Sequence, residues 1–382
     1  DLLGLGSPSF IHAPPVSAPP SAVAMACQEG PARELLVRFA QERGGLLIHP
    51  YMGSTPVWRM ALELHEASGV PVKVLAPPPP VTWVANDKEL LTQVAQGVCS
   101  DAVLGSAPTP ETLAGSSAKE LASRLLELAG RHERVALKMT RCASAMGNEV
   151  FESQDVVSWD AERLLVEVER FLSEKEWKAG EPVLAVQWLD IQSSPSTQLW
   201  VPPLGEGLPT VDGVYEQLLE GEECVFLGSV PSRLGDEMDQ RLSVASVRVA
   251  RVFQELGYVG RCSFDFVISD GDAYFVECNG RWGGTSTPMH LLDRVFPKGR
   301  PAYRARDYLD ARLAGVPFPQ ILEAIGDALY DHRTGQGSYV LYNVGCQALY
   351  GKFDVIALGD SIEAANRALE ERLPALLERC TG

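Results

Sequence analysis

Residues 263–284 read SFDFVISDGDAYFVECNGRWGG, and this stretch decides how the fold of the chain is interpreted. Two short apolar runs, SFDFVIS and AYFVEC, flank Asp270, Gly271 and Asp272. Apolar runs separated by an Asp-Gly turn are typical of a β-hairpin. The stretch therefore predicts two antiparallel strands joined by a tight turn.

The register of this hairpin follows from its side chains. A two-residue loop would place Phe264 opposite Glu277 and interrupt the apolar face. We therefore expect a three-residue loop, which places Asp265 opposite Glu277. The apolar pairs would then be Phe264–Cys278, Phe266–Val276 and Ile268–Tyr274.

Asp265, Glu277 and Asn279 share the polar face of this predicted hairpin, because side chains alternate with period 2. Two carboxylates and an amide oxygen suit Mg²⁺, which takes one or two protein carboxylates together with substrate phosphates. A polar, solvent-exposed hairpin face without a metal is the alternative interpretation.

Arg281 follows two residues after Asn279 and points a cation at the same place. An arginine beside a metal can neutralise the charge of a phosphoryl group in transfer, or it can simply pair with Glu277. Gly283 and Gly284 let the backbone approach a ligand closely. Together these residues favour phosphoryl-transfer chemistry.

A second candidate phosphate contact lies upstream of the hairpin. Lys138 ends the strand-like run RVALKM and precedes the small-residue stretch 142–147. An ammonium followed by backbone N–H groups suits nucleotide phosphates. The stretch is not a Walker A motif, and no G-x-G-x-x-G follows a first strand.

In this order, these segments resemble the ATP-grasp superfamily of carboxylate–amine ligases. The resemblance runs from Asn86 to Val295, through APTPETL, the Lys138 strand, VLAVQWL and the hairpin. The runs VYEQLLEGEECVFLGSVPS, ECNGRWGGTST and GKFDVIALGDSIEAA are most similar to the pheganomycin-type peptide ligases.

The resemblance implies an α/β (α+β) fold in three parts. Residues 1–85 would form an N-terminal α/β pre-ATP-grasp domain with a mobile Pro-rich arm, and strand–helix–strand alternation up to Pro77 predicts a parallel sheet there. Residues 86–295 would form the two-lobed ATP-grasp domain, with lobe A at about 86–186 and lobe B at about 187–295. Residues 296–382 would form a small C-terminal α+β domain. Within lobe A, residues 107–115 are expected to be a loop.

The resemblance also implies a nucleotide site. Lys138 would contact the α and β phosphates of ATP. The adenine edge would be read by the Gln187 carbonyl and the Leu189 N–H, with Asp190 as the candidate for the ribose. The loop over the triphosphate would include Ser144, Ala145 and Gly147.

Metal and substrate roles follow in the same way. Two Mg²⁺ ions would be bound by Asp265, Glu277 and Asn279, and Arg281, with Lys138, would be catalytic. His290 is either a substrate contact or an ordinary, partly buried histidine. The candidates for substrate contacts are Arg261, Ser263, Trp282, Gly283, Gly284 and His290.

The sequence departs from the family pattern at several positions. Val186 stands where relatives often have glutamate, and Met146 stands where glycine is frequent. Ser263 stands where some relatives have an arginine, a role for which Arg261 is the substitute candidate.

The activity implied is ATP-dependent formation of an amide bond through an acyl phosphate, with release of ADP and phosphate, in natural product biosynthesis. The expected partners are ATP, an amino-acid-type carboxylate, the amine of an amino acid or peptide, and a second copy in a homodimer. An ATP-grasp carboxylase or phosphotransferase, or a non-catalytic ATP-binding regulator, remains open.

Composition narrows the class of protein further. The chain has 382 residues and a net charge of −17, so duplex nucleic acid is a poor expectation for its main partner. No run approaches the roughly 18 apolar residues that span a bilayer, so no membrane association is expected. The eight scattered cysteines are expected to be reduced thiols of a cytoplasmic protein. Because the chain starts at Asp1 without an initiator methionine, we expect it to be incomplete at its N-terminus.

Overall fold

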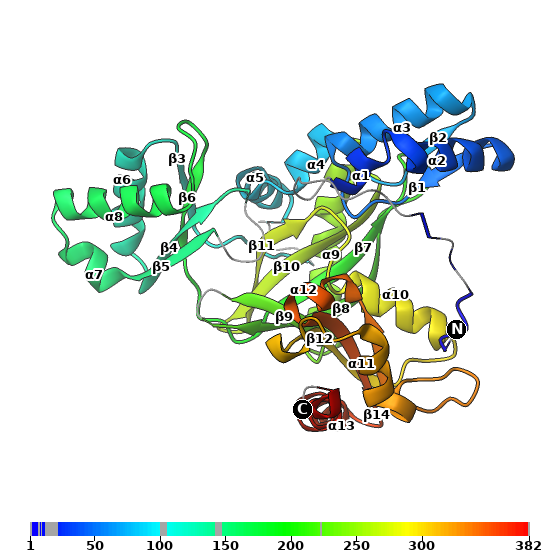
Figure 1. The fold of residues 1–382 in the computed structure, drawn as a ribbon. Helices are drawn as coiled ribbons and strands as arrows, with labels where there is room; N and C mark the ends of the chain where they lie inside the picture. Colours follow the sequence, from blue (N-terminus) through cyan, green and yellow to red (C-terminus); the bar gives the residue numbers. More distant parts are fainter. Residues whose placement is uncertain are drawn as a thin grey trace.

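Three β-sheets organise the chain in a computed structural model that describes residues 2–6, 8, 10–11, 22–99, 105–141, 147–221 and 224–380. The sheets have two, four and eight strands, and helices pack around each of them (Figure 1). This mixed α/β architecture is the fold class expected from the sequence. In the described part of the chain, no helix is both long and apolar enough to cross a bilayer.

The N-terminal region holds the smallest sheet. Its two strands pair in parallel, as the strand–helix–strand pattern predicts. Buried Met60 and Leu64 join the helices to the sheet. The elements are α1 (Ala22–Ala26), α2 (Gly30–Arg43), β1 (Leu46–Ile48), α3 (Thr55–Ser68) and β2 (Val72–Val74).

Two helices lead from this region toward the larger sheets. Helix α4 (Pro79–Ala85) begins inside the tetraproline run, where a proline in the first turn needs no hydrogen-bond partner for its nitrogen. Helix α5 (Lys88–Cys99) buries Leu91 and Ala95 in the same core as the hairpin strands. The start of the predicted lobe A therefore packs on lobe B.

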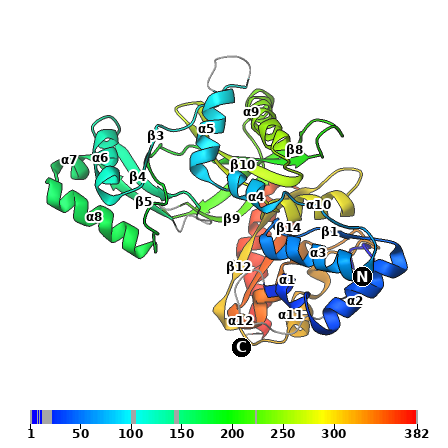
Figure 2. The same cartoon turned by 90° about the horizontal axis from the view of Figure 1, so that it is seen from above.

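The four-stranded sheet has the order β3-β6-β4-β5 and lies at one side of the molecule in Figure 2. Its strands are β3 (Thr112–Gly115), β4 (Arg134–Met139), β5 (Asn148–Glu152) and β6 (Val183–Gln187). Its helices are α6 (Ala118–Ala129), α7 (Ser153–Ser158) and α8 (Ala161–Glu174). The loop expected over 107–115 is wrong for its last four residues, because β3 pairs antiparallel with β6.

The eight-stranded sheet has the order β11-β10-β7-β8-β9-β12-β14-β13. Its strands are β7 (Pro195–Val201), β8 (Thr210–Glu220), β9 (Val225–Pro231), β10 (Gly260–Ser269), β11 (Asp272–Asn279), β12 (Ala302–Leu309), β13 (Tyr339–Tyr342) and β14 (Lys352–Gly359). Its long helices are α9 (Asp236–Glu255) and α10 (Ser286–Val295). The sheet runs without interruption into the C-terminal region.

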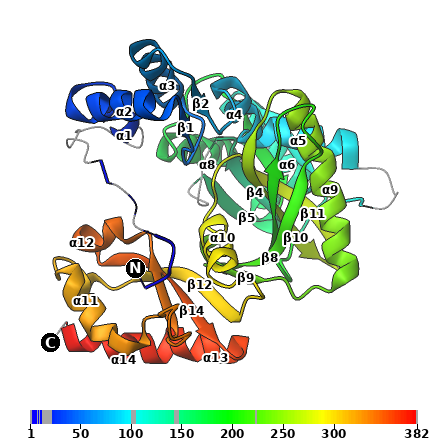
Figure 3. The same ribbon diagram turned by 90° about the vertical axis from the view of Figure 1, so that its right-hand side faces the viewer.

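A narrow junction connects the C-terminal strands to the others. Strands β9 and β12 pair at only two positions, Ser229 with Ala305 and Gly228 with Arg306. A Cβ atom on Gly228 would lie 2.1 Å from the Ala305 carbonyl oxygen, so only glycine fits there. Beyond the junction lie α11 (Phe318–Ile325), α12 (Gln347–Tyr350), α13 (Ile362–Arg367) and α14 (Leu373–Leu377), grouped in Figure 3.

The structure corrects the hairpin loop. Asp265 pairs with Glu277 and Phe264 with Cys278, as predicted. The register then shifts, so that Phe266 pairs with Phe275 and the predicted pairs Phe266–Val276 and Ile268–Tyr274 are wrong.

The physical reason for this correction is a β-bulge at Val276. The turn has two residues rather than three, and the extra residue in the bulge restores the register, so the apolar face is still unbroken. Both turn residues have positive φ, 50° at Asp270 and 79° at Gly271, as a type I′ hairpin turn requires.

Candidate active site

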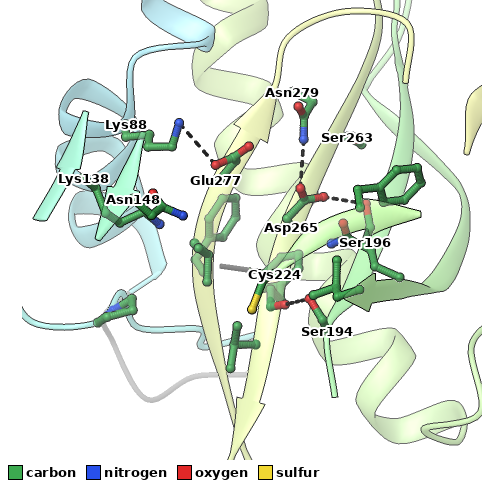
Figure 4. A pocket seen from close by; sticks show the side chains of 18 of the residues that line it. Lys88, Lys138, Asn148, Ser194, Ser196, Cys224, Ser263, Asp265, Glu277 and Asn279 are labelled. Carbon is green, nitrogen blue, oxygen red and sulfur yellow. Dashed lines mark hydrogen bonds and ion pairs between the residues drawn. The ribbon is translucent and has the colours of Figure 1, made fainter. Parts of the chain in front are cut away.

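A pocket lies between the four-stranded sheet and the polar face of β10 and β11 (Figure 4). Strands β4, β5 and β6 form one wall, and β7, β10 and β11 form the other. The start of α5 and the segment before α10 contribute further residues. Eleven of the residues expected at the site line this pocket: Lys138, Gly147, Gln187, Leu189, Ser263, Asp265, Glu277, Asn279, Arg281, Gly283 and Gly284.

Asp265 and Glu277 form the centre of the pocket as a cross-strand pair. The Ser196 hydroxyl donates a hydrogen bond of 2.7 Å to Asp265 Oδ1, and Asn279 Nδ2 donates one of 2.8 Å to Oδ2. Glu277 instead forms an ion pair of 3.3 Å with Lys88 Nζ. Both carboxylates therefore have polar partners, as buried charges require.

The two carboxyl groups differ in proton affinity. Burial, followed by repulsion from Glu277, raises the pKa of Asp265 to about 7. Burial also acts to raise the pKa of Glu277, but the ammonium groups of Lys88 and Lys138 hold that pKa below its ordinary value. Glu277 is therefore the more acidic carboxyl group of the pair.

Lys138 reaches the pocket from β4 and is 7% exposed. Burial lowers the pKa of its ammonium to about 8, although the charge of Glu277 opposes this shift. The ammonium nitrogen lies 5.9 Å from the centre of the Trp188 ring, and Asn148 is its cross-strand neighbour. A cation held this way is available to an anionic ligand in the pocket.

Lys88 is one of the pocket residues that the sequence did not predict. Asp87 caps α5 by accepting hydrogen bonds from the backbone N–H groups of Glu89 and Leu90 at 3.0 and 3.2 Å. The Lys88 N–H donates to the Thr140 carbonyl at 3.1 Å, which ties the helix start to the end of β4. An aspartate before an amphipathic run signals a helix start, but nothing local predicts that the next residue meets Glu277.

Arg281 projects beside the carboxylates. Its Nη2 donates to Asn279 Oδ1 at 2.6 Å and its Nη1 donates to the Trp282 carbonyl at 3.2 Å. The guanidinium also lies 5.4 Å from the centre of the Tyr51 ring, which belongs to the N-terminal region. These contacts fix the cation at the edge of the pocket, and the simple pairing with Glu277 is not the arrangement observed.

The donor set fits a magnesium ion that shares its ligands with a substrate. Asp265, Glu277 and Asn279 offer two carboxylates and an amide oxygen on one surface. Among the described residues, no group of three or more His, Cys, Asp or Glu could hold a metal alone. A metal here would take its remaining ligands from water or phosphate, as Mg²⁺ commonly does.

The end of the pocket near β6 contains the expected adenine contacts. Gln187 is fixed by Glu111, because its N–H donates to the Glu111 carbonyl at 2.8 Å and its Oε1 accepts from the Glu111 N–H at 3.2 Å. Gln187 and Leu189 both line the pocket. Asp190 is not among the lining residues; its side chain is 97% exposed and pairs with Arg134 at 3.1 Å.

The opposite end of the same sheet face carries Arg261, which also lies outside the lining. Arg261 forms an ion pair with Asp212 and lies 5.2 Å from the centre of the Trp200 ring. Burial lowers the pKa of its guanidinium. Its charge is therefore compensated within the protein.

Trp282 and His290 are also absent from the lining. The Trp282 ring centre is 5.0 Å from that of His49 and 5.3 Å from that of His290. Burial, followed by the charge of Arg261, lowers the pKa of His290 to about 4, so its ring is neutral at pH 7. The roles of these residues toward a substrate stay predictions, and Ser144 and Ala145 lie outside the described residues.

Several solved enzymes have a similar fold. N5-carboxyaminoimidazole ribonucleotide synthetase from Thermus thermophilus shares 17% identity and covers 91% of this chain and 84% of its own, with a TM-score of 0.56. The biotin carboxylase domain of Hydrogenobacter thermophilus 2-oxoglutarate carboxylase, in complex with MgADP, ADP and bicarbonate, shares 16% identity over 90% and 76% of the two chains, with a TM-score of 0.55.

A third similar structure is carboxyaminoimidazole ribonucleotide synthase from Aspergillus clavatus complexed with ATP, which shares 14% identity over 91% of this chain and 95% of its own, with a TM-score of 0.54. No family model matches the sequence, and no curated protein matches it either. These structures establish that the chain has the ATP-grasp fold expected from its sequence.

Proposed function

We propose that this protein is an ATP-dependent ligase that joins a carboxylate to an amine and releases ADP and phosphate. The observation that carries the proposal is the pocket in which Lys88 and Lys138 face the carboxylate pair Asp265 and Glu277. Paired cations and carboxylates can exchange their internal contacts for the phosphates of a magnesium nucleotide.

The reaction has two balanced steps. A carboxylate oxygen of the acyl donor attacks the γ-phosphorus of ATP, which gives an acyl phosphate and ADP. The amine then attacks the acyl carbon and displaces phosphate, losing a proton as the amide forms. Phosphate is a far better leaving group than the oxygen of a free carboxylate.

In this proposal, different residues bind the phosphates, the metal ion and the adenine. Lys138 and Lys88 bind phosphate oxygens, and Arg281 neutralises charge on the phosphoryl group in transfer. Glu277, Asp265 and Asn279 hold Mg²⁺, which when bound compensates the charge that develops on the phosphates. The backbone at Gln187 and Leu189 positions adenine, and Asp190 is the proposed ribose contact.

The acyl donor is proposed to be of the amino-acid type and the acceptor an amino acid or peptide. This proposal rests on the resemblance to the pheganomycin-type peptide ligases in ECNGRWGGTST and neighbouring runs. The three-part domain division, a homodimer and two Mg²⁺ ions belong to the same proposal. The related biotin carboxylase domain is described as a dimer.

Carboxylation is the second candidate function. The biotin carboxylase domain with this fold was solved with MgADP and bicarbonate, so bicarbonate is an alternative carboxylate for the same pocket. The distinction lies in the acyl donor rather than in the nucleotide contacts.

Hydroxylamine trapping tests the proposal and separates the two candidates. The protein is incubated with Mg-ATP, pooled amino acids and hydroxylamine, and hydroxamate is measured together with ADP and phosphate. We expect hydroxamate from an amino-acid-type donor and at least a hundredfold loss, about 3 kcal/mol of barrier, in Glu277→Gln.

Glu206→Gln is the matched control, because Glu206 is exposed and is not among the lining residues. ADP release that requires bicarbonate and yields no hydroxamate would support carboxylation instead. Nucleotide binding with no turnover for any amino acid, small peptide or bicarbonate would contradict both and favour a regulator.

A further inference from the structure

A series of buried side-chain hydrogen bonds runs along the wall of the pocket from Asp265 to the glycine segment 283–284. It passes through Ser196 and Gln198 on β7 and Ser286 at the start of α10. Each of these three residues is only 3% exposed. Asp265 lies at one end and the Gly283 N–H at the other.

Every hydrogen bond in this series has a defined donor. The Gly283 N–H donates to Ser286 Oγ at 3.0 Å, and that hydroxyl donates to Gln198 Oε1 at 3.1 Å. Gln198 Nε2 then donates to Ser196 Oγ at 3.2 Å, and that hydroxyl donates to Asp265 Oδ1 at 2.7 Å. All the donors therefore point toward the carboxylate, and reversing one link would leave another buried group without its partner.

The Gln198 amide links the two halves of this hydrogen-bond series. Its oxygen accepts from Ser286 on the α10 side, and its nitrogen donates to Ser196 on the Asp265 side. A glutamine amide can bridge a donor and an acceptor in this way without any change of protonation.

The glycine segment has little room to move independently. Ser286 N–H donates back to the Gly283 carbonyl at 3.1 Å, which closes a tight turn before α10. A Cβ atom at Gly284 would lie 2.7 Å from the Phe226 ring, so the backbone is packed directly against β9. Asp265, Gly283, Gly284 and Gln198 all line the pocket.

We propose that Gln198 is a positioning residue whose hydrogen-bond series couples ligand binding at the Asp265 face to ordering of residues 281–287. In the proposed ligase, on which this inference rests, the glycine segment borders the space next to the transferred phosphoryl group. Nucleotide binding thereby prepares the part of the pocket that receives the acyl donor.

The expected coupling free energy is limited by the weakest hydrogen bond in the series. A buried neutral hydrogen bond contributes about 1 kcal/mol, which corresponds to roughly a fivefold change in an equilibrium constant. Binding of a magnesium nucleotide should therefore slow amide exchange in residues 281–287 about fivefold when the series is intact.

Hydrogen–deuterium exchange of residues 281–287, with and without saturating Mg-ADP, tests the proposal. The proteins compared are the wild type, Gln198→Met, Ser286→Ala and the double variant. Each single change should abolish the Mg-ADP-dependent slowing of exchange. The double variant should lose no more than either single variant, because one substitution already interrupts the hydrogen-bond series.

Thr197→Val is the matched control. Thr197 lies next to Gln198 on β7 but faces the opposite side, where its hydroxyl forms a buried hydrogen bond of 2.7 Å with Ser246. This variant loses a comparable buried bond, so general destabilisation acts on it too. It should keep the nucleotide-dependent slowing.

Calorimetry of Mg-ADP binding distinguishes a failure of the coupling from a failure of the proposed function. If Mg-ADP binds to the wild type but does not slow exchange in 281–287, or if Gln198→Met retains the slowing, the coupling is overturned while the proposed ligase stands. If Mg-ADP does not bind to the wild type at all, the proposed function fails and the coupling fails with it.

Discussion

Two ends of one sheet face handle charge in opposite ways. At the charged end, Asp265 and Glu277 lie on the face of β10 and β11, and Lys88 of α5 and Lys138 of β4 face them. At the ring end, Arg261 lies on the same face of β10, and the rings of His49, Trp282 and His290 pack together near it. At the charged end, buried groups of both signs face each other across the pocket. At the ring end, aromatic contacts dominate and burial favours neutral imidazole.

The difference indicates at which end the charged side chains can exchange their contacts within the protein for contacts with a ligand. At the charged end, the cations and the carboxylates can each find a new counterpart in a magnesium nucleotide. At the ring end, Arg261 already forms an ion pair with Asp212, and the Trp282 and His290 rings pack against each other. Substitutions should therefore be most costly at the charged end.

Removing Lys88 should have the largest effect on stability. In Lys88→Met, Glu277 and Asp265 lose a cation while Lys138 remains, so the free energy of unfolding should fall by about 1–3 kcal/mol. Urea unfolding at pH 7 measures the loss. Lys119→Met is the control on an exposed helical site, and an equal loss there would show that the ion pair contributes nothing.

His290 should give the next largest effect, through pH. Its folded pKa of about 4 lies below the ordinary 6.5, so the unfolded chain binds more protons between these values. Stability should be complete above pH 6.5 and fall as the pH drops toward 4. In His290→Gln this fall should be smaller by about 1–2 kcal/mol, allowing for the partial exposure of the ring.

Urea unfolding of both proteins at several pH values between 7 and 4 checks this expectation. His65→Gln is the control, because His65 is exposed on α3. Parallel pH profiles for the wild type and His290→Gln would contradict the neutral, buried imidazole.

Trp282→Phe should give the smallest effect. The change removes the hydrogen bond of 2.8 Å from Trp282 Nε1 to Thr287 Oγ1 but keeps an aromatic ring beside His49 and His290. The free energy of unfolding should fall by about 1 kcal/mol in urea titrations. A loss above about 3 kcal/mol would identify the indole as core packing and make the ring end the more sensitive of the two.

The carboxylate pair could be predicted from sequence because its geometry is local. Alternation along two strands joined by a short turn fixes Asp265 opposite Glu277, and the structure confirms this pair. The loop length could not be predicted, because a bulge at Val276 compensates for the shorter turn. Alternation alone cannot distinguish one extra loop residue from one extra strand residue.

Lys88 could not be predicted because its partner is distant in sequence. The helix that carries it packs in the core beneath the hairpin, and only that packing brings its ammonium to Glu277. Arg261 shows the opposite limit. It shares a strand face with Asp265, yet its contacts with Asp212 and Trp200 place it outside the pocket lining.

The two-pair junction between β9 and β12 has a consequence for how the molecule comes apart. Residues 302–377 have their own buried cluster around Phe353 and Leu373, and in the described part of the chain their strands pair with the larger sheet at Gly228 and Ser229 alone. Local unfolding follows such boundaries, because cooperative units separate where few bonds cross between them. The C-terminal strands should therefore open and reclose as one foldon, and opening must also separate Tyr303 and Ile356 from the buried side chains of Tyr215 and Met289.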